Sequence, residues 1–244
     1  MTLRLLAVIG LSFQLYPFST CFAQSPDSVL YSSSTTGLQQ LYFKEIGDNA
    51  QIYHGSEFIR NGIKVNGFPF FGSDSLLSGS VSYQGSLYEN RNLQYNLLTD
   101  ELITNNYTHT SFIALSTEKV DSFTISNQLF VRLVATKSNG LPKTKFYGQL
   151  VSGEPGLVVN RYKKFVAATG SIDAKYSAYD EYYIRLKNVY YPVNGKNELL
   201  EIFADRKDEL KKYIRSNKIK FNKNLESSLM LTVIYYSRLK HLNE

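Results

Sequence analysis

The chain has 244 residues, 14% of them aromatic and none of them Trp, with 27 Lys or Arg against 21 Asp or Glu and a net charge of +6. Disordered chains contain few aromatic residues, so this composition predicts a globular protein. The one cysteine, Cys21, lies near the start, so the rest of the chain has no thiol for a disulfide, a thiolate nucleophile or a cysteine-ligated metal.

The first two dozen residues have the pattern of a secretory signal peptide. Arg4 precedes an apolar-biased run from Leu5 to Leu15 and a small-residue exit that ends at Ala23. The run is shorter than the roughly 20 apolar residues that span a bilayer. We therefore expect cleavage after Ala23 and export to the periplasm or cell envelope, with no transmembrane segment in the mature chain. The alternative, a lipid on Cys21, lacks the usual aliphatic and small residues before the cysteine.

Removing residues 1–23 takes away one Arg, which leaves 26 basic and 21 acidic residues in 221, a net charge of +5. Four segments then follow from the sequence pattern. They are the signal peptide (1–23), an N-terminal arm with a short helix (24–50), an antiparallel β domain (51–193) and a C-terminal helical segment packed on that domain (194–244). The short helix is predicted from helical spacing of Leu38, Leu41, Tyr42 and Ile46.

Alternating apolar and polar residues between turn signals predict strands throughout the β domain. The expected strands are residues 80–83, 87–95, 101–104, 112–115, 122–125, 129–135, 145–151, 157–165 and 182–189. Short loops without helical crossovers join them, so we expect antiparallel pairing. The predicted fold class is α+β, mainly an antiparallel β meander, and both a sandwich and an open half-barrel fit the pattern.

The last 48 residues return to helical spacing. One apolar stripe holds Leu199, Leu200, Phe203, Leu210, Tyr213 and Ile214, and a final helix carries Leu225, Leu229, Thr232, Val233, Tyr236 and Leu239. Asn197 is the expected N-cap of the first helix. Asp205 has the chemistry to cap a second piece, so one bent helix and two short helices both remain open. We expect the stripe and the final helix to pack against the β domain.

Residues 205–223 hold the strongest concentration of charge, with eight basic residues against three acidic ones. Such a segment can bind an anionic surface, for example lipid headgroups or lipopolysaccharide phosphates. The candidate patch comprises Lys211, Lys212, Arg215, Lys218, Lys220 and Lys223. A solvated helix face explains the same residues, and we favour that interpretation because Asp208 and Glu209 interrupt the cationic run. Export argues against nucleic acid as a partner.

No other motif specifies a chemistry. His54, His109 and His241 share no metal-ligand spacing. Nucleophile elbows, phosphate-binding glycine loops and dinucleotide fingerprints are absent from the sequence, so no cofactor is expected. A hydrolytic pair needs just two carboxylates, placed by the fold. The candidates are Asp100, Glu101, Glu118, Asp121, Asp180 and Glu181, for which turn capping is an equally good explanation.

Several runs of residues together resemble uncharacterised exported proteins of the Bacteroidota. They are residues 52–58 (IYHGSEF), 67–71 (GFPFF), 79–88 (GSVSYQGSLY), 93–96 (LQYN), 118–123 (EKVDSF), 208–214 (DELKKYI) and 218–221 (KIKF). The similarity covers about residues 50–240 and consists of structural residues. It differs from the family pattern at His54, where Asn is frequent, and at Phe68, where His is frequent. The resemblance implies export and a shared fold, and it adds no activity or substrate.

These observations favour a non-catalytic exported envelope protein that binds a partner protein, a lipid or a glycan. Two alternatives belong to other classes. One is a carrier for lipids or lipoproteins, which requires an apolar cavity beneath the helices. The other is a hydrolase that acts on envelope polysaccharide through two carboxylates. The oligomeric state does not follow from the sequence.

Overall fold

The structure, a computed structural model, describes residues 51–60, 65–170 and 173–241. The strands are β1 (Ser56–Glu57), β2 (Leu77–Tyr83), β3 (Ser86–Asn96), β4 (Glu101–Asn105), β5 (Phe112–Ala114), β6 (Val120–Ile125), β7 (Gln128–Leu133), β8 (Lys145–Val151), β9 (Gly156–Val166), β10 (Lys175–Leu186) and β11 (Val189–Val193). The α-helices are α2 (Lys196–Ile202), α3 (Lys207–Ser216) and α4 (Leu225–His241), and 3₁₀ turns lie at Gln51–Tyr53, Thr117–Lys119 and Ala204–Arg206. The signal peptide, Cys21 and the short helix expected before residue 47 lie outside the described residues.

All 11 strands belong to one sheet, in the order β1-β5-β4-β3-β2-β6-β7-β8-β9-β10-β11. Each pair of neighbouring strands is antiparallel, which confirms the α+β, mainly antiparallel β fold. Sequence order is interrupted where β6 pairs with β2 instead of β5. The sheet is open, with β1 and β11 at its edges, so the described strands do not form the two-sheet sandwich that the sequence also allowed.

Three hairpins close with two-residue turns in which both residues have positive φ. These turns are Gln84–Gly85 (φ 52° and 76°), Ser126–Asn127 (50° and 63°) and Lys187–Asn188 (50° and 62°). Type I′ turns require this backbone, and their twist matches the twist of the strands that they join. The short turns explain why consecutive strands become sheet neighbours.

One strand prediction was wrong at the C-terminal end of the sheet. The stretch 182–189 was predicted as a single strand, but it holds the end of β10, the Lys187–Asn188 turn and the first residue of β11. Asn188 was the available signal, since Asn tolerates positive φ in a hairpin turn. The apolar and aromatic residues on both sides hid the turn from a pattern based on alternation.

An aromatic cluster fills one face of the sheet across four strands. Tyr95, Phe123, Phe130 and Phe146 are each 0–1% exposed. Their ring centroids lie 5.0 to 6.0 Å apart, and most of the pairs have an edge-to-face or tilted geometry. Such pairs add about 0.5–1.5 kcal/mol to the burial of the rings. This part of the core is therefore built from rings that are packed against one another.

The turn between β3 and β4 touches two strands that are not its neighbours in the sheet. The backbone N–H of Lys163 in β9 donates to the carbonyl of Leu97 at 3.1 Å, and the N–H of Phe146 in β8 donates to the Asp100 carboxylate at 3.5 Å. Strands β8 and β9 pair only beyond Gly148, and the turn lies where they separate. The sheet is thus bent enough to bring its two halves into contact.

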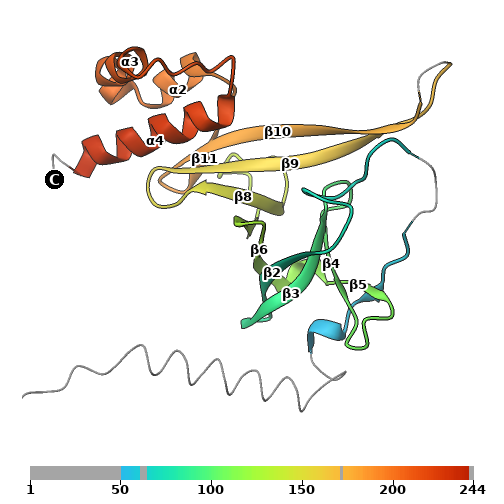
Figure 1. The fold of residues 1–244 in the computed structure, drawn as a ribbon. Coiled ribbons are helices and arrows are strands. Elements are labelled where there is room, and N and C mark those ends of the chain that lie inside the picture. Colours follow the sequence, from blue (N-terminus) through green and yellow to red (C-terminus); the bar gives the residue numbers. More distant parts are fainter. Residues whose placement is uncertain (1–50, 61–64, 171–172, 242–244) are drawn as a thin grey trace, which may run out of the picture. The chain divides into compact units, whose positions relative to one another are not determined.

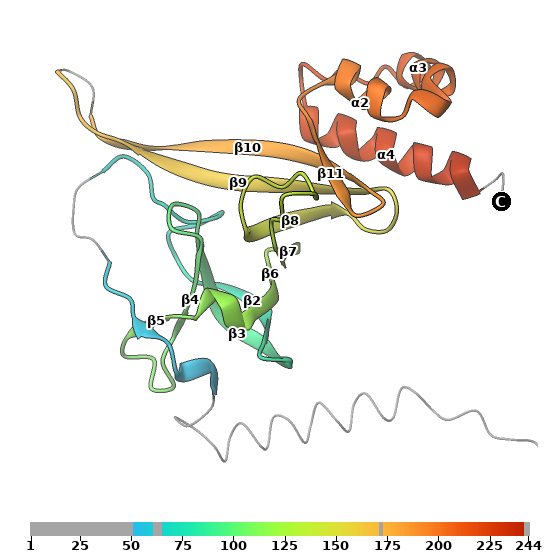
Figure 2. The ribbon, with the colours of Figure 1, turned by 180° about the vertical axis from the view of Figure 1, so that it is seen from behind.

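The three helices cover the other end of the sheet, against β8 to β11 (Figures 1 and 2). Their apolar faces and the sheet residues beneath them form one buried cluster. Its members include Leu157, Val159 and Ile184 from the sheet and Leu199, Leu200, Phe203, Leu210, Ile214, Leu229, Val233 and Tyr236 from the helical segment 196–241, which we call the helical cap, or cap. Leu210 and Ile214 of the stripe, and Leu229 and Val233 of the final helix, thus lie in the same buried cluster as the sheet residues.

The segment before α4 forms two short helices rather than one bent helix. A 3₁₀ turn at Ala204–Arg206 separates α2 from α3. Both predicted caps were wrong. Asn197 lies inside α2, whose N-cap position is Gly195, and the N-cap position of α3 is Arg206, which makes no side-chain capping bond. Asp205 instead accepts hydrogen bonds from the Tyr236 hydroxyl at 3.0 and 3.1 Å, so its carboxylate ties the turn to α4.

Candidate functional site

Helix α3 has three distinct faces. Leu210 and Ile214 point into the core and are 0% and 4% exposed. Since each residue of an α-helix turns the chain by about 100°, residues at i, i+4 and i+8 form a row. The row beside the buried face is Lys207, Lys211 and Arg215, and all three are exposed. The amphipathic pattern of α3 therefore places three cations on one edge of the helix.

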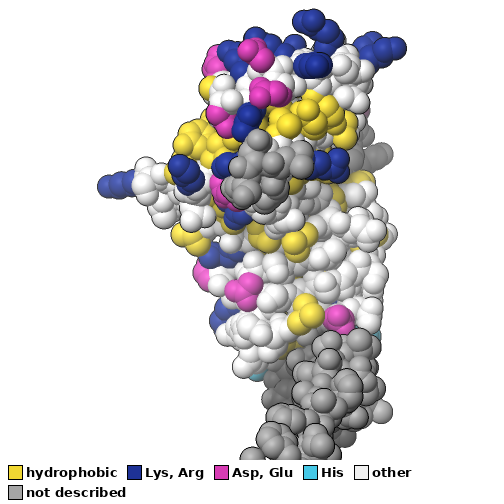
Figure 3. All heavy atoms as spheres, turned by 90° about the vertical axis from the view of Figure 1, so that its left-hand side faces the viewer, with side chains coloured by type: hydrophobic (Ala, Val, Ile, Leu, Met, Phe, Trp, Pro, Cys, Tyr) yellow, Lys and Arg dark blue, Asp and Glu magenta, His cyan; other side chains and the backbone are white. Residues whose placement is uncertain are grey.

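A groove of about 710 Å³ lies along this row, between α3, α2 and the connector after α3. It is lined by Lys196, Asn197, Leu200, Glu201, Lys207, Lys211, Ile214, Arg215, Lys218, Ile219 and Lys220, and we call it the cationic groove. Six lining residues are Lys or Arg and one is a carboxylate. Lys and Arg side chains gather at the helical end of the molecule in the space-filling view (Figure 3).

The groove includes part of the predicted patch. Lys211, Arg215, Lys218 and Lys220 line it, whereas Lys212 and Lys223 do not. Lys196 and Lys207 lie outside the predicted patch and belong to the groove. Lys207 could have been found from its position one turn before Lys211. Lys196 could not, because the packing of α2 against α3 brings it there.

The carboxylates of α3 lie outside the groove. Asp208 pairs with Lys211 at 3.5 Å, and Glu209 pairs with Arg206 at 3.4 Å, but neither carboxylate is a lining residue. Within the described part of the chain, the five groove cations other than Lys211 make no ion pair. In the sequence these acidic residues interrupt the cationic run. In space, Asp208 and Glu209 are absent from the groove lining, although Asp208 pairs with Lys211 at the edge of the groove.

The end of α3 holds Lys218 in a strained backbone conformation. Lys218 has φ 52°, its N–H bonds to the carbonyl of Arg215 at 3.2 Å, and the N–H of Ile219 bonds to that of Ile214 at 3.0 Å. These two bonds define a Schellman motif, in which the left-handed residue is usually Gly. A left-handed backbone costs an L-residue about 1–2 kcal/mol. The chain carries this cost at a residue whose side chain lines the groove.

A second cavity, of about 370 Å³, has a balanced lining. It is lined by residues 58–60, by residues of the segment 65–74, by the β3–β4 turn and by Tyr176. Arg60, the one cation among the described lining residues, pairs with Asp74 at 3.5 Å and donates to Gln94 at 2.9 Å. Glu101 adds a further carboxylate to the lining. Because the charges nearly cancel, this cavity has no electrostatic preference for a class of ligand.

The carboxylates proposed for hydrolysis each have a partner or a place in a turn. Glu101 accepts from Thr99, Asp121 from Ser82 and Asp180 from Arg161, while Glu118 lies in the first turn of a 3₁₀ helix. Glu181 accepts three hydrogen bonds at 2.9 to 3.3 Å, from Asn160, Tyr162 and Tyr183. Glu101, Asp121, Asp180 and Glu181 thus each accept at least one hydrogen bond from a neighbouring side chain.

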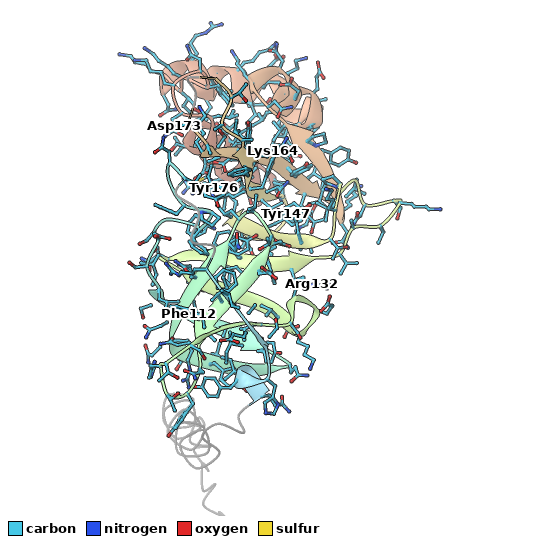
Figure 4. All side chains as sticks on the ribbon, turned by 90° about the vertical axis from the view of Figure 1, so that its right-hand side faces the viewer. Phe112, Arg132, Tyr147, Lys164, Asp173 and Tyr176 are labelled. Carbon is cyan, nitrogen blue, oxygen red and sulfur yellow. The ribbon has the colours of Figure 1, made fainter. Side chains whose placement is uncertain are left out.

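The side chain of Asp100 is partly buried, with 21% of its surface exposed. It accepts a bond from the Tyr95 hydroxyl at 2.5 Å, and Lys145 lies 3.9 Å away. Burial raises the pKa of the Asp100 carboxyl above its ordinary value and lowers the pKa of the Lys145 ammonium below its own. Figure 4 places Tyr147, a neighbour of Lys145 in β8, between the helical end and the strands that carry Phe112 and Arg132. The cluster lies inside the sheet, away from the cationic groove.

His54 and His109 lie in separate turns of the chain. No group of three or more His, Cys, Asp or Glu side chains is arranged to hold a metal ion in residues 51–60, 65–170 and 173–241. Over the same residues, no helix combines the length and the apolarity needed to cross a membrane. No protein-family model, curated protein or solved structure matches the chain. The cationic groove is therefore the feature from which a function can be argued.

Proposed function

We propose that this protein is a non-catalytic exported envelope protein that binds an anionic partner through the cationic groove. The observation that carries the proposal is the composition of the groove lining: six cations and one carboxylate line one concave surface. A solvated helix face does not require such a composition. The signal-peptide pattern supports export, and the anionic molecules of an envelope include lipid headgroups and phosphorylated glycans.

The arrangement also works against the stability of the cap, which supports a binding role. Lys207, Lys211 and Arg215 follow one another at i, i+4 spacing on α3. Like charges at this spacing destabilise a helix by about 0.2–0.5 kcal/mol per pair. An anion in the groove would remove this repulsion. Of these three cations, Lys211 already pairs with Asp208, and a bound anion would give Lys207 and Arg215 an acidic partner as well.

The expected affinity for an anionic membrane surface follows from the number of cations. Each Lys or Arg close to such a surface contributes about 1 kcal/mol. Six would contribute about 6 kcal/mol, which corresponds to a dissociation constant on the order of tens of micromolar. Exposed charges are screened beyond about 8 Å at physiological ionic strength, so the binding should weaken as salt is added.

The test compares two charge reversals of equal size in the same segment. Lys211→Glu with Arg215→Glu changes two groove residues, and Lys212→Glu with Lys223→Glu changes two residues outside the groove. Cosedimentation with vesicles of anionic phosphatidylglycerol in phosphatidylcholine measures binding. We expect the groove pair to weaken binding at least about tenfold, because it replaces attraction by repulsion at the contact. The control pair should have a much smaller effect.

Equal losses in the two double variants would contradict the proposal, because net charge rather than the groove would then control binding. Circular dichroism melts of both variants show whether the cap still folds. The four residues are exposed, so each variant should remain folded. Vesicles of phosphatidylcholine alone serve as the uncharged surface.

The two alternative functions have less support. A lipid carrier needs an apolar cavity beneath the helices, and there Leu157, Val159 and Ile184 of the sheet form one buried cluster with the apolar side chains of the helices. A hydrolase needs two carboxylates that face a substrate, and Glu181 already accepts bonds from three side chains. We therefore place the function at the surface of the cap.

A further inference from the structure

We infer that the ligand of the cationic groove carries at least two phosphate groups that are separated along the molecule. This inference rests on the proposed function and specifies the class of anion. Its first support is the length of the cationic row. An α-helix rises about 1.5 Å per residue, so Lys207 and Arg215, eight residues apart in α3, lie about 12 Å apart along the axis. The row is longer than a single phosphate, so phosphates at two places along it can contact different cations.

The second support is the charge of the groove. Six cations and Glu201 give the lining a net charge of +5. A phosphate monoester carries about −1.5 to −2 at neutral pH. One such group leaves more than half of the lining charge uncompensated, whereas two or three groups balance it. Full neutralisation of the groove therefore takes a polyvalent ligand.

The third support is the shape and chemistry of the surface. The volume of about 710 Å³ falls within the roughly 300–1,000 Å³ typical of small-molecule sites, and it is far larger than a single phosphate. Ile219, which is partly buried, presents apolar atoms to the groove beside the nearly buried Leu200 and Ile214, and these residues lie among the cations. They suit a less polar scaffold that joins the charged groups. Lys196 on α2 and Lys220 on the connector place cations around the row.

Linked phosphates should bind much more tightly than separate ones. Once the first group is bound, the second binds from an effective concentration set by the linker, and avidity can exceed a single affinity by about 10²–10⁴-fold. The gain is lost if the geometry prevents simultaneous contact. A spaced bisphosphate should therefore exceed inorganic phosphate by about 100-fold, and it should also exceed pyrophosphate, whose two phosphorus atoms share one oxygen.

The experiment titrates the full mature protein with three soluble probes by calorimetry: inorganic phosphate, pyrophosphate and fructose 1,6-bisphosphate. A parallel arm compares vesicles of cardiolipin, which carries two phosphates per lipid, with phosphatidylglycerol vesicles of equal charge density. Tighter binding of fructose 1,6-bisphosphate than of pyrophosphate supports the inference and indicates a soluble ligand. Preference for cardiolipin with no preference among the soluble probes supports it and indicates a lipid-borne ligand.

A variant at one end of the row distinguishes a ligand that makes phosphate contacts at both ends from a ligand that makes one. Lys207→Gln should lower the affinity for the preferred bisphosphate at least about tenfold and leave the affinity for inorganic phosphate nearly unchanged, since phosphate can bind at the other end. Lys212→Gln, outside the groove, is the matched control. Probes that bind in proportion to their charge alone, in both arms, would overturn the inference and leave the proposed function standing. Binding of no anionic probe would overturn both.

Discussion

Lys218 is a residue at which stability and binding have opposite requirements. Its positive φ of 52° favours Gly, yet its side chain lines the cationic groove. Lys187 provides a comparison, because it has a φ of 50° in the β10–β11 turn and lies outside the groove. The two lysines therefore have nearly the same φ, but only Lys218 lines the groove.

Lys218→Gly should stabilise the protein by about 1 kcal/mol, since it relieves the left-handed strain and loses part of the gain to the greater freedom of Gly in the unfolded chain. The same change should weaken binding to anionic vesicles, because it removes a groove cation. Urea unfolding and cosedimentation measure the two effects.

Lys187→Gly is the control for this prediction and should stabilise the fold without changing vesicle binding. Lys218→Asn, which tolerates positive φ and removes the charge, should weaken binding as Lys218→Gly does. If Lys218→Gly kept full binding, the side chain of Lys218 would have no part in the contact.

At the scale of elements, α4 joins the cap to the sheet through one face. Leu229 is fully buried in the cluster that includes Leu157 and Ile184, whereas Leu231, two residues later, is 48% exposed. Leu229→Ala should lower the free energy of unfolding by about 2–5 kcal/mol, as cavity-forming Leu truncations do. Leu231→Ala should change it by about 0.5 kcal/mol or less. Chemical denaturation measures both, and equal effects would contradict the packing of α4 on the sheet.

The elements that were predicted well are those whose residues alternate in a regular way. The strand at 145–151 matches β8, and the apolar stripe is buried in the core except for Tyr213, which is partly exposed. The prediction failed where a turn lay among apolar residues, at Lys187–Asn188. Caps were also misplaced, because Asp205 bonds to Tyr236 on a helix that is distant in sequence. A local sequence pattern predicts whether a segment is a helix or a strand. It does not predict which distant residues that segment contacts.

The groove was only partly predictable for the same reason. Basic residues in 205–223 were evident from the sequence, but the sorting of Asp208 and Glu209 away from the groove depends on how α3 is rotated against the sheet. Leu210 and Ile214 set that rotation, because they must be buried. The position of Lys196 depends in addition on the 3₁₀ turn that folds α2 back on α3.

At the scale of the whole molecule, the β3–β4 turn holds the two halves of the bent sheet together. Asp100 receives bonds from Tyr95 in β3 and from the backbone of Phe146 in β8, with Lys145 at 3.9 Å. Two effects compete at this carboxylate. Burial favours its neutral form, while Lys145 and the hydrogen bonds favour its charged form, and the pKa of Asp100 is raised because burial is the larger effect. The contact between the halves therefore contains a carboxyl group, that of Asp100, which ionises less readily in the folded protein than it would in water.

This balance predicts the direction in which stability depends on pH. A carboxyl whose pKa is raised in the folded state contributes stability that is fully present below its ordinary value of about 3.9 and is lost as the pH rises through the folded pKa. Asp100→Asn keeps the shape of the side chain and removes the titration. The stability of the parent protein relative to Asp100→Asn should therefore fall as the pH is raised from about 3.5 to 7, as measured by urea unfolding at each pH. A rise over the same range would mean that Lys145 outweighs burial, and the contact between the two halves would then be held by an ion pair.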